Sequence, residues 1–83
     1  MEERSDTSET FTLTNLPVGT KGRVTAVHGS NRVTKRLLEM GVLPGVSVRV
    51  IKTAPFGDPI EVRVRGYSLA MRRNEADAID VAI

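Results

Sequence analysis

Cysteine and tryptophan are absent from this chain of 83 residues, and histidine occurs once, at His28. Without cysteine the protein can form neither disulfide bonds nor thiolate metal sites, and thiol redox chemistry is excluded. His28 has no nucleophile, orienting carboxylate or pair of further ligands near it in the sequence, so we expect a surface histidine at the end of a strand. A metal ion held there with a surface carboxylate would be adventitious. We therefore predict no cofactor.

Catalytic and membrane-spanning patterns are missing as well. The acidic residues show no two-carboxylate spacing that favours acid–base catalysis, and the segment Gly19–Gly22 lacks the lysine and helix that follow a phosphate-binding loop. No apolar run approaches the roughly 18–20 residues of a membrane span, and the N-terminus has no apolar secretory signal. The sequence predicts a non-enzymatic, cytoplasmic protein with no direct membrane insertion.

Aromatic residues are also few, namely Phe11, Phe56 and Tyr67. Small barrels that bind single-stranded nucleic acid place aromatic side chains among basic ones, because the bases stack on them. Polyproline recognition likewise uses an aromatic-lined groove. We therefore expect neither kind of partner. A small basic β-barrel that binds nucleic acid is the alternative function, because nine arginine and lysine side chains are spread over the body of the chain: Arg23, Arg32, Lys35, Arg36, Arg49, Arg63, Arg65, Arg72 and Arg73.

The charges that are present are unevenly distributed. The net charge is +2, from 12 basic and 10 acidic residues. Residues 1–10 hold four acidic residues and one basic residue, a balance of 1 − 4 = −3, so residues 11–83 carry 11 − 6 = +5. The polar composition of residues 1–10 predicts a disordered acidic tail, and residues 11–83 form the predicted domain. A basic body either suits an acidic partner surface, whether protein, nucleic acid or anionic lipid, or keeps a small domain in solution.

Alternating apolar residues between glycine and proline breaks predict short strands over residues 11–13, 22–28, 46–52, 60–65, 67–72 and 79–83. Val33, Leu37 and Met40 recur at i, i+4 and i+7 after a capping residue at Ser30 or Asn31, and Gly41 follows. This pattern predicts a helix with an apolar stripe, which Leu38 widens. The fold expected is mainly β: a small SH3-like barrel of about five short antiparallel strands, with one α-helix between strands 2 and 3 and the last strand beside the first.

The junction between the helix and the next strand holds the candidate functional residues. Leu43 lies outside both the helical stripe and the strand alternation. It either packs under the helix end or is displayed to a partner at the Pro-Gly corner. The predicted contact residues are the corner and the basic helix face: Val42, Leu43, Pro44, Arg32, Lys35 and Arg36. Leu43 would be the apolar anchor, with the basic side chains steering toward an acidic partner surface.

Several segments in this order and spacing resemble the FeoA family. They are Leu16-Pro17-Val18-Gly19, Gly22 with the following strand, Arg36 to Gly45, Phe56-Gly57-Asp58-Pro59, and Gly66 with Leu69 to Ala76 leading to Ile79 and Val81. The resemblance covers residues 11–83. The acidic tail ahead of Phe11 departs from the compact family pattern, and it is assigned no role.

The resemblance implies an SH3-like barrel and a small cytoplasmic accessory protein of bacterial ferrous iron uptake. The implied partner is FeoB, a membrane iron transporter with a cytoplasmic GTPase domain. The same domain type closes metal-dependent repressors of the DtxR kind. Their DNA-binding and dimerisation domains are missing here, so a free-standing FeoA protein, monomeric or weakly oligomeric, is the closer match.

Overall fold

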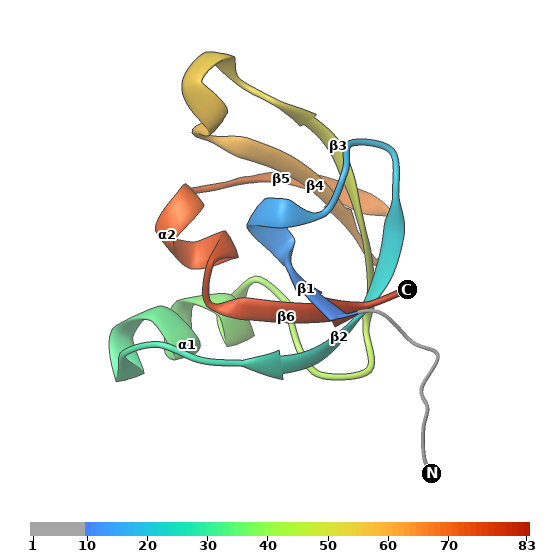
Figure 1. Ribbon diagram of the computed structural model, residues 1–83. Helices are drawn as coiled ribbons and strands as arrows, with labels where there is room; N and C mark the ends of the chain where they lie inside the picture. The colour runs from blue at the N-terminus through green and yellow to red at the C-terminus, as the bar shows by residue number, and fades with distance from the viewer. Residues whose placement is uncertain (1–9) are drawn as a thin grey trace, which may run out of the picture.

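A computed structural model describes residues 10–83. One antiparallel sheet holds six strands in the order β1-β6-β2-β3-β4-β5 (Figure 1). The strands are β1 (Thr10–Thr12), β2 (Lys21–Val27), β3 (Ser47–Thr53), β4 (Ile60–Val64), β5 (Tyr67–Met71) and β6 (Ile79–Ala82). The helices are α1 (Asn31–Glu39) and α2 (Arg73–Ala76), and 3-10 turns span Leu13–Asn15 and Pro55–Gly57.

The mainly β architecture, with one longer helix between the second and third strands, is confirmed. The sheet has six strands where about five were expected, and the shortest, β1, pairs with β6 along Thr10–Thr12. That pairing of the first and last strands was predicted. The predicted tail, residues 1–10, lies outside the described residues except for Thr10, which begins β1. No helix within residues 10–83 is long and apolar enough to cross a membrane.

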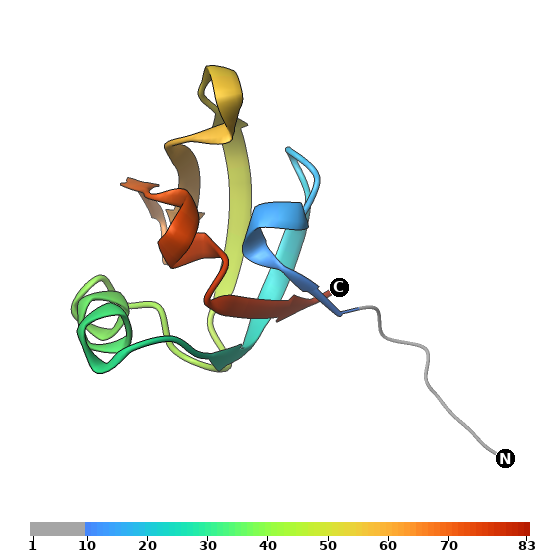
Figure 2. The same cartoon turned by 60° about the vertical axis from the view of Figure 1, so that its left-hand side comes forward.

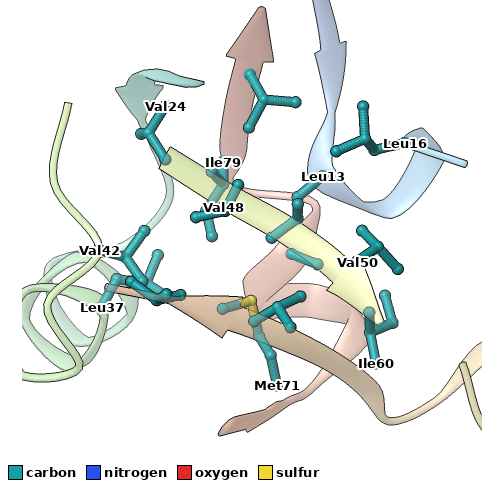
Figure 3. Close-up of a cluster of buried hydrophobic side chains, with 14 of the residues drawn as sticks. Leu13, Leu16, Val24, Leu37, Val42, Val48, Val50, Ile60, Met71 and Ile79 are labelled. Carbon is teal, nitrogen blue, oxygen red and sulfur yellow. The ribbon is translucent and has the colours of Figure 1, made fainter. Parts of the chain in front are cut away.

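The sheet curls around a single apolar core (Figure 2). Register shifts in β2 between Val24 and Ala26, and in β3 between Val50 and Lys52, bend the two long strands. Alternate side chains of β4, and of β3 as far as its register shift, point inward and are buried as the alternation predicted: Val48, Val50, Ile60, Val62 and Val64. Figure 3 shows this cluster meeting α1 through Leu37.

Helix α1 is held by its cap and by its packing on the sheet. The Ser30 side chain accepts a hydrogen bond from the Val33 N–H at 3.3 Å, so Ser30 is the N-cap. Leu37 is fully buried, and Val33 and Met40 pack against the core. Tyr67 in β5 donates its hydroxyl to the Met40 carbonyl at 2.7 Å, which ties the end of the helix to the sheet.

Candidate docking surface

The outward face of α1 combines basic residues with one exposed leucine. Arg32 and Lys35 are exposed, and so is Leu38, at 54%. Positions three apart on a helix are neighbours, so Lys35 lies between the other two. The prediction that Leu38 widens the buried stripe is wrong, because it projects about 100° around the helix from Leu37. The step of about 100° between consecutive helical residues already placed Leu38 outside the stripe of Val33, Leu37 and Met40, and the sequence-based prediction overlooked it.

The end of α1 has the hydrogen bonds of a Schellman motif. The Gly41 N–H donates to the Leu38 carbonyl at 3.0 Å, and the Val42 N–H donates to the Leu37 carbonyl at 2.9 Å. Gly41 has a φ of +85°, which favours glycine over other residues. In this motif the residue after the glycine contacts the helix three positions before the cap. Val42 accordingly packs beside Leu37, with both residues 0% exposed (Figure 3).

Val42 therefore has no surface to offer a partner, and its inclusion among the predicted contact residues is wrong. The corner that follows it is a tight turn, in which the Val46 N–H donates to the Leu43 carbonyl at 3.1 Å. Pro44 precedes Gly45, which has a φ of +96°, an arrangement typical of a type II turn. Leu43 is partly exposed and Pro44 is exposed, so both can contact a partner.

Arg36 has a structural role that the sequence did not reveal. Its Nε lies 2.5 Å from Oε2 of Glu75 in α2, and the Glu75 residue is only 5% exposed. The other oxygen of that carboxylate accepts a hydrogen bond from the Arg72 N–H at 3.0 Å. A buried carboxylate needs such partners, because the charge is costly to remove from water. Arg36 thus joins α1 to α2, although 61% of its side chain remains exposed.

His28 is exposed at the end of β2, as predicted, and its Nε2 lies 2.6 Å from Oδ2 of Asp80 in β6. Within the described part of the chain, no group of three histidine, cysteine or acidic residues is placed to hold a metal ion.

Phe56 is the most exposed apolar residue described, at 100%. It lies in the loop between β3 and β4 with a φ of +70°, which is uncommon for an aromatic residue. This loop joins the opposite end of β4 from the Arg65-Gly66 turn, and it contributes no residue to α1 or the corner. The sequence pattern gave no indication that the Phe56 side chain is fully exposed.

A family model for the FeoA domain matches residues 11–83. This chain belongs to the FeoA family. Members of the family are non-catalytic accessory proteins. The chain is 34% identical, over 71 residues, to a fusion of Fe(2+) transport protein A with the Fe(2+) transporter FeoB from Porphyromonas gingivalis. The match covers 86% of this chain and 8% of the fusion protein.

Solved FeoA structures share the fold. The FeoA protein from Chlorobium tepidum is 42% identical, with a TM-score of 0.81 over 88% of this chain and 70% of that one. The Stenotrophomonas maltophilia FeoA, a prokaryotic SH3 domain protein determined with zinc, is 33% identical, with a TM-score of 0.75 over 86% and 88% of the two chains. The SH3-like prediction is thereby confirmed.

The predicted likeness to metal-dependent repressors is confirmed at the level of the fold. A manganese-dependent transcriptional repressor superposes with a TM-score of 0.82 at 19% identity, over 92% of this chain and 42% of the repressor. The FeoA fold is therefore also one part of a larger regulatory protein.

Proposed function

We propose that this FeoA protein is a cytoplasmic accessory protein of bacterial ferrous iron uptake that binds the FeoB transporter. The fusion protein carries the argument, since it holds a related FeoA segment and FeoB in one chain. Fusion raises the effective concentration of two modules for each other, which favours pairs that act together. A separate FeoA chain needs a binding surface to achieve the same proximity.

The docking surface consists of Arg32, Lys35, Leu38, Leu43 and Pro44, with Arg36 beside it. Leu38 takes the place that Val42 had in the sequence-based prediction. Leu38 and Leu43 are the apolar anchors, because buried apolar side chains supply most of the affinity of protein interfaces. The lysine and arginines around them steer the domain toward an acidic surface of FeoB and raise the association rate.

Co-purification with full-length FeoB and ferrous iron uptake in cells test this proposal. Leu43→Arg is expected to reduce both. Because Leu43 is partly buried, the variant Leu38→Arg provides a second test at an exposed position. Val18→Arg is the matched control, since Val18 is 57% exposed and lies between β1 and β2, outside the docking surface. Unchanged co-purification and uptake with folded Leu43→Arg and Leu38→Arg would show that the transporter binds elsewhere.

The oligomeric state expected is a monomer or weak oligomer. Sedimentation velocity of the purified chain at several concentrations measures it. A dimer that persists on dilution would contradict this expectation.

A further inference from the structure

The outer face of the sheet carries basic residues in register on adjacent strands. Lys21 in β2 pairs with Arg49 in β3, and Arg49 pairs with Arg63 in β4. Directly paired residues point to the same side of a sheet, and neighbouring strands lie about 4.8 Å apart. Arg23 and Arg65 extend this row toward the Arg65-Gly66 turn. We define these five exposed residues as the cationic face: Lys21, Arg23, Arg49, Arg63 and Arg65.

This arrangement works against the stability of the sheet. Like charges directly opposite each other on paired strands repel. Within residues 10–83, no carboxylate lies within 4.0 Å of a charged nitrogen of these five side chains. The acidic residue of β4, Glu61, faces Lys52 instead, at 3.7 Å. Folding alone would favour neutral or acidic residues here, so the cations indicate a function on this surface.

The backbone of Arg65 is a second feature of this face that lowers the stability of the fold, independently of the charge repulsion. It occupies the first position of the two-residue turn between Val64 and Tyr67, with a φ of +55°. Turns of this kind favour asparagine, aspartate or glycine, because other side chains are strained at positive φ. Strained residues of this type concentrate at binding sites.

The composition of the cationic face indicates what it contacts. A hollow of about 320 Å³ lies over it, lined by Lys21, Ser47, Val48, Arg49, Arg63, Arg65 and Gly66. None of the described residues that line the hollow is aromatic, so bases have nothing to stack on. Among these described residues the one large apolar residue is Val48, which is 1% exposed, so they offer a protein partner no apolar anchor. Four of the five cations are arginines, whose guanidinium groups bind phosphate through paired hydrogen bonds.

We propose that the cationic face adsorbs to the phosphate headgroups of an anionic membrane surface, without inserting into it. Several basic residues on one face attract a protein to such lipids additively. The proposal does not depend on FeoB, because the cationic face and the docking surface share no residue. If both hold, lipid contact orients the domain beside the transporter.

The test is co-sedimentation of the full chain with vesicles of phosphatidylcholine, alone or mixed equally with phosphatidylglycerol, at an ionic strength of about 0.15 M, where the Debye length is only about 8 Å. Wild type is expected to bind only the mixed vesicles, and less as salt is added. The double variant Arg49→Gln with Arg63→Gln should lose roughly 25-fold in partitioning, because each basic residue contributes about fivefold. Both side chains are exposed, so this variant should fold.

The matched control is Arg32→Gln with Lys35→Gln, which removes the same net charge from exposed positions of α1. It should partition within about twofold of wild type, because these residues lie outside the cationic face. Equal losses in the two double variants would overturn the proposal, since net charge alone would then explain binding. Equal binding to both vesicle types would also overturn it. Release of the protein from the vesicles by inorganic phosphate at constant ionic strength would overturn the proposal, and so would preferential binding of the protein to duplex DNA.

Discussion

The two exposed basic surfaces of this protein differ in what accompanies the charge. On the docking surface, Arg32 and Lys35 share the outward face of α1 with an exposed leucine, Leu38, and the partly exposed Leu43 follows at the corner. On the cationic face, the arginines lie beside Ser47 and other cations. Apolar anchors with a basic rim suit a protein partner, whereas cations alone suit a dispersed anionic target. The neighbours of an arginine therefore indicate its function better than its charge does.

The largest effect on stability is expected at the corner, where Val42 is buried and Pro44 is exposed. Val42→Asp should lower the free energy of unfolding by about 4 kcal/mol or more, because it places a charge in the core without a partner. Pro44→Ser, two residues later, should change it by less than about 1 kcal/mol. Chemical denaturation measures both. Equal stabilities of the two variants would mean that Val42 is not part of the core and is available to a partner.

A smaller effect separates the structural arginine of α1 from the docking residues. Arg36→Gln should cost about 1–2 kcal/mol, because it leaves the buried Glu75 carboxylate without its cation while water still reaches the site. Arg32→Gln, on the same helix, should change stability by at most about 0.5 kcal/mol. Thermal and denaturant unfolding provide the measurement. Adding Glu75→Gln to Arg36→Gln should recover part of the lost stability. Similar stabilities of Arg36→Gln and Arg32→Gln would show that Arg36 has no structural role distinct from that of Arg32.

The smallest effect has the opposite sign. Arg49→Gln with Arg63→Gln should raise the free energy of unfolding by about 0.2–1 kcal/mol, because it relieves the repulsion of paired like charges. The gain should decrease in high salt, which already screens that repulsion. Denaturation at two salt concentrations measures it. A loss of stability would mean that these arginines stabilise the sheet, which would contradict the view that the cationic face is kept for binding.

Much of the fold could be predicted because burial on one face leaves a regular trace in the sequence. Ile60, Val62 and Val64 alternate, and all three are buried. Gly41 was recognisable as a helix stop because only glycine readily adopts its left-handed conformation. Val42 was assigned to the wrong side of the corner, although an apolar residue after such a glycine is itself part of the Schellman signature.

The remaining features depend on contacts that join distant parts of the chain. Arg36 and Glu75 meet because the fold brings α1 and α2 together, and no local spacing encodes that meeting (Figure 1). The same is true of His28 and Asp80, which are 52 residues apart. The alternation showed that Arg49 and Arg63 point outward, but only the strand register places them opposite each other beside Lys21.

The exposed helix face and the corner are the surface proposed to bind the transporter. The direct measurement is the affinity of the full chain for purified full-length FeoB, titrated with wild type, Leu38→Arg and Val18→Arg. Loss of an apolar anchor at an interface typically weakens binding by about 30-fold or more, and that loss is expected for Leu38→Arg. Val18→Arg, equally exposed, should bind like wild type. Equal affinities for all three proteins would contradict the proposal that this surface binds the transporter.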